Sequence, residues 1–166
     1  MELRKILHED DILIPMQADS KEEAIRQLAE MLKAHEVVMD MDAFMSDVFL
    51  REAEGVTGIG DYIAIPHGKS KGVKENRIAV GILQEPIYWE SIDELPVKVV
   101  ILFAVCARKH DADQSHLSMM AAVAKSLAVG MLVSLGHLLA ERIQDTLIVG
   151  ELGLDGKPRP DRKSVV

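Results

Sequence analysis

The fold is decided by the stretch VKVVILFAV, residues Val97–Val105. Apolar residues, many of them β-branched, follow one another there with a single interruption at Lys98. A strand that faces solvent on one side alternates between apolar and polar residues, whereas a strand buried on both faces is apolar almost throughout. The stretch therefore predicts a central strand that is covered on both faces of a sheet.

Upstream of this strand the sequence predicts three others. They cover Ile12–Ile14, Tyr62–Ile65 and Arg77–Leu83. Pro66 ends the second of them, because proline removes a donor from the hydrogen-bond ladder and pushes the preceding residue to extended dihedral angles. The glycine-punctuated segment 55–60 is predicted to be a loop.

Two helices are predicted between the first two strands. Ser20 and Glu23 have the spacing of a capping box, so a helix begins after Ser20. The apolar residues of this helix recur at helical intervals: Ile25, Leu28, Ala29 and Leu32. Asp40 or Asp42 caps the second helix, which has stopped by Gly55. Its inward-facing residues are Phe44, Met45, Val48 and Phe49.

Two more helices are predicted after the central strand. One opens at Asp113 or Ser115, and the other covers about Leu132–Gln144. Strands interleaved with helices predict a three-layer α/β domain, in which helices flank a mixed sheet on both faces. We expect this domain to occupy residues 1–150 and a polar, disordered tail to occupy residues 151–166.

The composition excludes several classes of function. The formal net charge of −8 disfavours binding to nucleic acids and to anionic membranes. Cys106 is the only cysteine, which leaves no disulfide framework and no Cys-x-x-Cys metal site. No apolar run reaches the ~20 residues of a membrane-spanning helix, and the N-terminus lacks an apolar signal region. We therefore expect a cytoplasmic protein without a bound metal or cofactor.

The residues suited to chemistry gather in segment 51–69, which reads REAEGVTGIGDYIAIPHGK. His67 leaves a predicted strand after a rigid proline, and a neutral imidazole offers a ring-nitrogen lone pair as nucleophile for phosphoryl transfer. We expect the other ring nitrogen to be held by a backbone carbonyl. Gly68 has no side chain, which leaves room for a phosphoryl oxygen or a partner's backbone beside the ring.

A phosphoryl group spreads its charge over three oxygens and needs donors around it. Thr57, Gly58 and Gly60 are candidates, through a hydroxyl and a nest of backbone N–H groups. Arg51 offers a guanidinium fork, or alternatively stabilises the C-terminus of its own helix. His116 stands in the first turn of the third predicted helix, where an anion is favoured, and is otherwise an ordinary exposed residue.

The joint pattern resembles a known family, the fructose–mannitol type enzyme IIA domains of the bacterial phosphoenolpyruvate-dependent phosphotransferase system, nitrogen-regulatory members included. The similarity covers roughly residues 1–145. It is carried by Arg51-Glu52, Thr57–Gly60, Ile63–Gly68, Pro86–Trp89, Leu95–Val97 and Ser115–Leu117.

This resemblance implies a mixed, five-stranded sheet and a phosphotransferase that works through a phosphohistidine at His67. His116 would be the second active-centre histidine, and Arg51 the arginine that assists the phosphoryl group. The donor would be the carrier HPr or a paralogue, and the acceptor a cysteine of an enzyme IIB domain. A sugar-uptake subunit and a regulatory module, whose phosphorylation switches affinity for a transporter, kinase or transcription factor, both remain open. Trp89 is more similar to the sugar-specific members.

Overall fold

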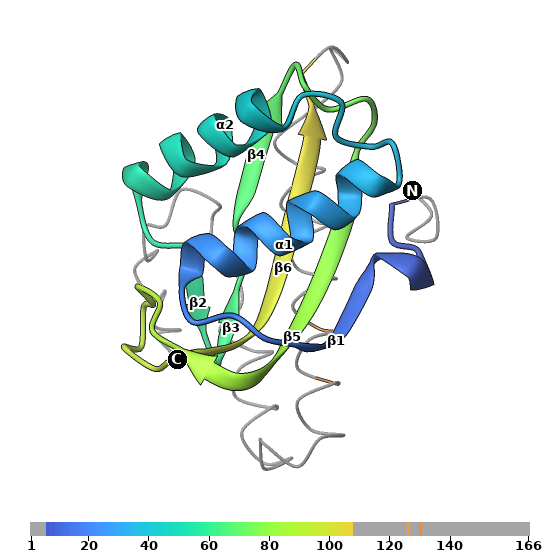
Figure 1. The fold of residues 1–166 in the computed structure, drawn as a ribbon. Coiled ribbons are helices and arrows are strands. Elements are labelled where there is room, and N and C mark those ends of the chain that lie inside the picture. Colours follow the sequence, from blue (N-terminus) through green and yellow to red (C-terminus); the bar gives the residue numbers. More distant parts are fainter. Residues whose placement is uncertain (1–5, 108–125, 127–129, 131–166) are drawn as a thin grey trace, which may run out of the picture.

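Two helices and one six-stranded sheet are built by the residues that the computed structural model describes, namely 6–107, 126 and 130 (Figure 1). The strands are β1 (Ile12–Met16), β2 (Gly58–Gly60), β3 (Ile63–Ala64), β4 (His67–Ser70), β5 (Arg77–Ile87) and β6 (Val97–Cys106). The helices are α1 (Lys21–Ala34) and α2 (Met41–Glu54), and a short 3-10 turn, η2 (Glu9–Asp11), precedes β1. The order of strands is β1-β5-β6-β3-β2, and β4 also pairs with β6.

The sheet is mixed, as the sequence predicts. β5 runs antiparallel to β6, whereas β1 is parallel to β5, and both β3 and β4 are parallel to β6. Every residue of β6 is buried, which confirms the predicted central strand. Val100, Leu102 and Ala104 belong to one apolar cluster, whereas the alternate residues of the same strand belong to a second one.

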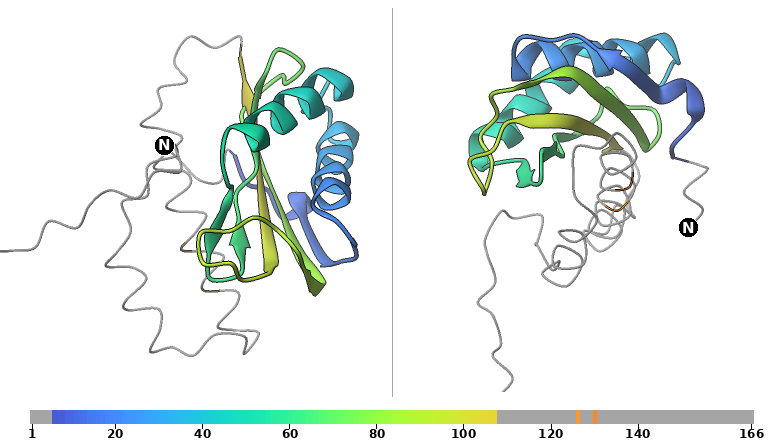
Figure 2. Two further views of the ribbon diagram at one scale, coloured as in Figure 1. Left: turned by 90° about the vertical axis from the view of Figure 1, so that its left-hand side faces the viewer. Right: turned by 90° about the horizontal axis from the view of Figure 1, so that it is seen from below.

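Both α1 and α2 lie on one face of this sheet, over the first of these clusters (Figure 2). The second cluster, on the opposite face, gathers apolar side chains of β3, β5 and β6 around Ile101 and Phe103. The two helices predicted after β6 fall outside the described residues, as do the proposed boundary at residue 150 and the segment 151–166. Within the described part of the chain, no helix is long and apolar enough to cross a membrane.

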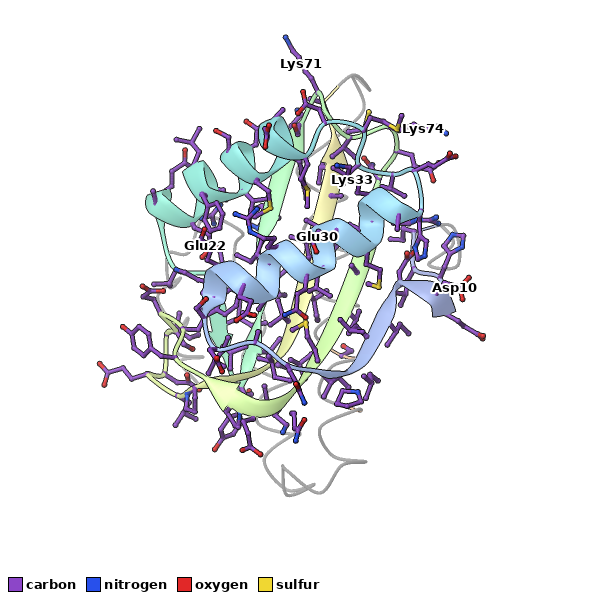
Figure 3. All side chains as sticks on the ribbon, viewed as in Figure 1. Asp10, Glu22, Glu30, Lys33, Lys71 and Lys74 are labelled. Carbon is purple, nitrogen blue, oxygen red and sulfur yellow. The ribbon has the colours of Figure 1, made fainter. Side chains whose placement is uncertain are left out.

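The start of α1 follows from its local sequence. The Ser20 hydroxyl accepts a hydrogen bond from the Glu23 backbone N–H at 3.2 Å, as the capping-box spacing predicts. The four apolar residues predicted to face the core are all fully buried. The opposite side of the helix carries Glu22, Glu30 and Lys33 into solvent (Figure 3).

Helix α2 is capped by Asp40, whose carboxylate accepts from the Ala43 N–H at 3.0 Å. Its buried residues Phe44 and Val48 pack against β4 at Gly68. A Cβ atom on Gly68 would lie 2.6 Å from Val48 Cγ2, so the glycine allows the helix to approach the strand closely.

Two strands were not predicted, and they raise the number from four to six, one more than the resemblance implies. Residues 58–60, predicted to be a loop, pair with β3 as β2. The chain also rejoins the sheet directly after Pro66, so His67 opens β4 instead of leaving the sheet. Pro66 has no N–H, but its carbonyl accepts from Phe103 N at 3.0 Å, which keeps the chain beside β6 across the interruption.

The strand predicted to end at Leu83 continues to Ile87. The pairing of β5 with β6 shifts register between Ile82 and Ile87. Such an irregularity accommodates Pro86, which donates no hydrogen bond to the ladder.

Candidate active site around His67

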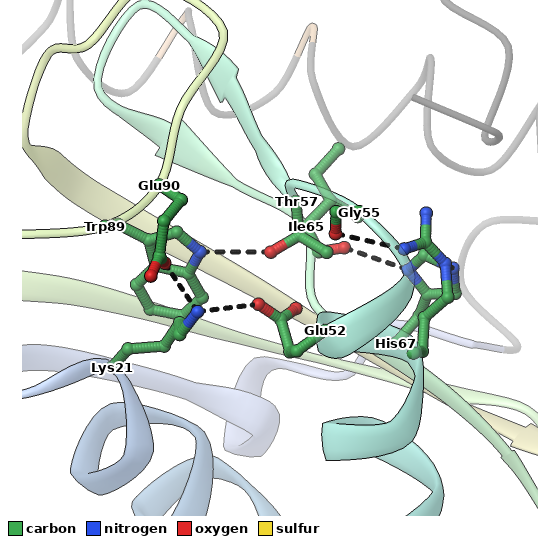
Figure 4. Close-up of polar contacts among 9 residues, drawn as sticks. Lys21, Glu52, Gly55, Thr57, Ile65, His67, Trp89 and Glu90 are labelled. Atoms are coloured by element: carbon green, nitrogen blue, oxygen red, sulfur yellow. Dashed lines mark hydrogen bonds and ion pairs between the residues drawn. The ribbon is translucent and has the colours of Figure 1, made fainter. Parts of the chain in front are cut away.

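His67 is half-buried at the first position of β4, and both of its ring nitrogens have partners. Nδ1 lies 3.0 Å from the Ile65 carbonyl oxygen, and Nε2 lies 3.0 Å from Arg51 Nε (Figure 4). A carbonyl only accepts and a guanidinium N–H only donates, so Nδ1 carries the ring hydrogen. Nε2 therefore presents its lone pair on the side of Arg51, and the predicted backbone carbonyl beside the other nitrogen is confirmed.

Arg51 comes from the last turn of α2 and touches its own helix end as well as the imidazole. Its Nη1 donates to the Gly55 carbonyl at 3.2 Å, while its Nε donates to His67. Of the two roles weighed for this residue, the structure shows the contact with the C-terminus of α2, and it also places the guanidinium at the ring. The structure brings together two residues that lie 16 positions apart in the sequence.

Burial lowers the pKa of the His67 imidazole, and the nearby Arg51 cation lowers it further. The hydrogen bond to Ile65 and the charge of Glu54 oppose this lowering without cancelling it. A pKa below the ordinary value of 6.5 keeps the ring neutral at physiological pH. Neutral imidazole is the form that acts as a nucleophile.

Thr57 was predicted to offer its hydroxyl to a phosphoryl group, but the structure directs this hydroxyl away from the imidazole (Figure 4). The side chain is 3% exposed, and its oxygen accepts from the Trp89 indole N–H at 3.0 Å. Its backbone carbonyl accepts from Ile65 N at 2.9 Å. Thr57 thus supports the segment that carries His67 and does not contact the ring.

In the nest of N–H groups predicted at Gly58 and Gly60, the Gly58 N–H already has a partner. Gly58 N donates to the Glu90 carbonyl at 3.2 Å, and both glycines pair with β3. A Cβ atom on Gly58 would lie 2.6 Å from the Glu90 oxygen, so this glycine serves the close docking of the β5–β6 loop onto β2. Gly68, predicted to leave room for a phosphoryl oxygen, instead leaves room for α2.

Four residues close to this site were not identified from the sequence as functional: Lys21, Glu52, Trp89 and Glu90. Lys21 Nζ lies 3.3 Å from a Glu52 oxygen, 2.5 Å from a Glu90 oxygen and 5.8 Å from the centre of the Trp89 ring (Figure 4). These contacts join α1, α2 and the β5–β6 loop. No local sequence pattern predicts them, because the partners come from distant parts of the chain.

The buried carboxyl of Glu52 has a perturbed pKa. Burial raises the pKa of Glu52 above its ordinary value, and the Thr57 hydroxyl and the Lys21 cation offset this only in part. The pKa of Lys21 is itself raised: burial lowers it, but the hydrogen bond to Glu90 and the charge of Glu52 outweigh that effect. No group of three side chains suited to hold a metal ion occurs in residues 6–107.

A family model decides the identity of the chain. The model describes the EIIA 2 component of the phosphoenolpyruvate-dependent sugar phosphotransferase system, and it matches residues 5–129. The chain belongs to this family. It is thus an EIIA-type domain of a phosphotransferase system, and the resemblance seen in the sequence is confirmed.

Relatives of this EIIA domain include both sugar-transport and regulatory proteins. The 2-O-alpha-mannosyl-D-glycerate-specific EIIABC component of Escherichia coli K12 is 34% identical over 129 residues, which are 77% of this chain but only 19% of that protein. The nitrogen regulatory protein of Klebsiella oxytoca is 32% identical over 131 residues, which are 77% of each chain.

Solved structures of EIIA domains have the same fold. The nitrogen regulatory protein IIA-Ntr of Neisseria meningitidis superposes with a TM-score of 0.68 at 25% identity, over 86% of this chain and 97% of that one. The IIA mannitol protein of Escherichia coli superposes with a TM-score of 0.61 at 21% identity, over 84% of this chain and 97% of that one. The second likeness concerns the fold alone.

Of the three residues predicted to act on the phosphoryl group in this EIIA domain, His67 and Arg51 lie together. The third, His116, lies outside the described residues. Near the ring the structure places the guanidinium of Arg51, whereas the Thr57 hydroxyl and the Gly58 N–H have partners within the protein.

Proposed function

We propose that this EIIA domain accepts a phosphoryl group on Nε2 of His67 and passes it to a partner protein. One observation carries the proposal: Nε2 has the free lone pair of the ring, because the other nitrogen donates to the Ile65 carbonyl, and the pKa of the ring is lowered. The neutral, oriented ring is a nucleophile, and the Arg51 guanidinium beside it suits a group that brings negative charge.

The transfer requires Arg51 to exchange one acceptor for another. Nε2 attacks phosphorus, a nitrogen–phosphorus bond forms, and the bond to the donor's nitrogen breaks and leaves its electron pair on the donor. The guanidinium then donates to phosphoryl oxygens in place of Nε2. Nδ1 keeps its hydrogen and its bond to Ile65 throughout, so no proton needs to leave the ring.

In the second half of the relay, a cysteine thiolate of the acceptor attacks phosphorus and the bond to Nε2 breaks. We propose an HPr-type histidine carrier as donor and an enzyme IIB domain as acceptor, in the cytoplasm. His116 would supply the second imidazole of the active centre. The family and the EIIABC relative support this role as the phosphocarrier subunit of a sugar phosphotransferase system.

Replacing His67 tests the nucleophile. His67→Ala is expected to abolish labelling by phospho-HPr, measured by phosphate-affinity electrophoresis and intact mass, because Nε2 is the atom that forms the bond. His8→Ala is the matched control, since this histidine is exposed and belongs to no strand or helix of the sheet domain. Undiminished labelling of His67→Ala would remove the assignment.

A regulatory role is the second candidate, and the nitrogen regulatory relatives, matched over 77% of their length, favour it. In this case phosphorylation of His67 controls binding to a transporter, a kinase or a transcription regulator. The phosphorylated domain, mixed with a purified sugar-specific IIB domain, separates the two roles. Transfer of the label to a IIB cysteine supports the relay, and retention of the label on His67 supports regulation.

A further inference from the structure

Trp89 has a hydrogen bond that links two segments of the candidate site. The ring is 2% exposed, although it directly follows Tyr88, which is 81% exposed. A buried indole N–H requires an acceptor, and here it donates to Thr57 Oγ1 at 3.0 Å. The bond fastens the β5–β6 loop to segment 55–57, which connects α2 with β2.

Segment 55–57 in turn is hydrogen-bonded to Arg51 directly and to His67 through Ile65. The Gly55 carbonyl accepts from Arg51 Nη1 at 3.2 Å. The Thr57 carbonyl accepts from Ile65 N at 2.9 Å, and the carbonyl of that same Ile65 accepts from His67 Nδ1 at 3.0 Å. A displacement of this segment would therefore disturb the guanidinium and the imidazole together.

Lys21 fixes the other side of the same assembly. Its ammonium group lies over the Trp89 ring, 5.8 Å from the centre, and forms ion pairs with Glu52 and Glu90 (Figure 4). Glu52 follows Arg51 directly in α2, so the ion pair ties the helical turn that carries Arg51 to the first residue of α1.

We propose that Trp89 and Lys21 are positioning residues for phosphoryl acceptance at His67. Trp89 acts through Thr57, and Lys21 acts through Glu52. The inference rests on the proposed function and adds to it two side chains, from α1 and from the β5–β6 loop, that set the geometry of the reacting pair.

Trp89→Phe tests the inference most directly, because it keeps a large aromatic ring and removes the N–H. Thr57→Val removes the acceptor of the same bond. Each variant is expected to accept the phosphoryl group from phospho-HPr roughly three- to tenfold more slowly than the wild type, the effect of one indirect hydrogen bond. Thr57→Val also removes the hydroxyl that interacts with Glu52. The double variant should therefore be slowed about as much as Thr57→Val alone, because Trp89→Phe removes only the bond that this change has already broken.

Nitrogen NMR of the His67 ring shows which of its two nitrogens carries the hydrogen, and a loss of stability alone would not change this. In the folded wild type, above the imidazole pKa, the ring hydrogen is expected on Nδ1 only. In Trp89→Phe and Thr57→Val, a share of the Nε2–H tautomer should appear, because the Ile65 carbonyl is no longer held in place. Trp89, the single tryptophan of the chain, reports by its short-wavelength emission that Thr57→Val is folded.

Tyr88→Phe is the matched control, since it removes a polar group from the neighbouring, exposed aromatic residue. It should keep the rate and the tautomer of the wild type. An unchanged rate in Trp89→Phe and Thr57→Val, or a slower rate with an unchanged tautomer, would overturn the inference while His67 remains the labelled residue. Absence of label on His67 in the wild type would instead overturn the proposed function.

Discussion

The two nitrogens of the His67 ring have different partners, and this difference decides which of them reacts. Nδ1 is bonded to the carbonyl of Ile65, in the short link between β3 and β4. Nε2 meets a long side chain, Arg51, which can turn from the lone pair to the oxygens of an incoming group. In the proposed relay, the Arg51 guanidinium therefore donates to Nε2 of the unphosphorylated ring and then to the oxygens of the bound phosphoryl group.

The pKa of His67 gives the first prediction at this scale. Its titration midpoint, followed by NMR, should lie below 6.5, because burial lowers the pKa and the Arg51 cation adds to this. Arg51→Gln removes that cation and should raise the midpoint, whereas Glu54→Gln removes an opposing anion and should lower it. Each shift should be a few tenths of a pH unit to about one unit.

The two variants control each other, since both remove one charge from the same turn of α2. As the pH falls below the lowered midpoint, the ring becomes protonated and loses its lone pair, so phosphoryl acceptance should decline there and not at neutral pH. Midpoints that move in the same direction in both variants would contradict this account of the site.

At the scale of elements, the site depends on how closely α2 approaches β4. Arg51 belongs to the helix and His67 to the strand, and the two elements meet where Gly68 leaves space for Val48. A wider separation would move the guanidinium away from the ring. The glycine after the histidine thus contributes to the site through the packing of α2.

Gly68→Ala should lower the free energy of unfolding by about 1–3 kcal/mol, because overpacking forces the surrounding structure to shift. The added Cβ would lie 2.6 Å from Val48 Cγ2 and 3.1 Å from Val48 N, and a backbone atom cannot yield as a side chain does. Urea denaturation measures the change. Gly55→Ala is the control, since the nearest atom to its Cβ would be 4.0 Å away; equal stability of the two variants would refute the packing argument.

How much of these elements the sequence predicts depends on how local their causes are. The starts of α1 and α2 are predicted from Ser20 and Asp40, because a cap is made by residues three positions apart. The short strands β2 and β4 are missed because a few residues form a strand only beside a partner. Pro66 argues against a continuing strand, yet its carbonyl bonds to β6.

For the candidate site, too, the sequence predicts what depends on a local motif and misses what depends on distant partners. His67 and Arg51 are found because they lie in one sequence motif whose resemblance to a family is specific. The sequence does not predict that the Thr57 hydroxyl bonds to Trp89 and Gly58 N to Glu90, because glycine-rich spacing does not reveal whether N–H groups face a ligand or a neighbouring segment. The contact of Lys21 with Glu90 spans 69 positions and has no local signature.

At the scale of the whole molecule, the reacting pair stands on a rigid base. β6 is buried along its full length between two apolar clusters, and β4 pairs with it residue by residue from His67 to Ser70. The strand that begins at His67 is therefore held by the sheet, while α2 runs beside β4 (Figure 1) and carries Arg51. The proposed nucleophile thus belongs to a strand of the sheet, and the cation beside it belongs to a helix.

The net charge of −8 leads to a prediction about encounters with the phosphoryl donor. A carrier with this charge attracts a partner through a basic docking face, and salt screens such attraction over a Debye length of about 10 Å at 0.1 M. The second-order rate of phosphoryl transfer from phospho-HPr should therefore fall, by roughly tenfold, as sodium chloride rises from about 0.05 to about 0.5 M.

Spontaneous hydrolysis of phosphorylated His67 involves no partner and should change little over the same range, which makes it the internal control. A transfer rate as insensitive to salt as the hydrolysis would mean that docking depends on apolar contacts, for which Leu50, 64% exposed on α2 one position before Arg51, is a candidate.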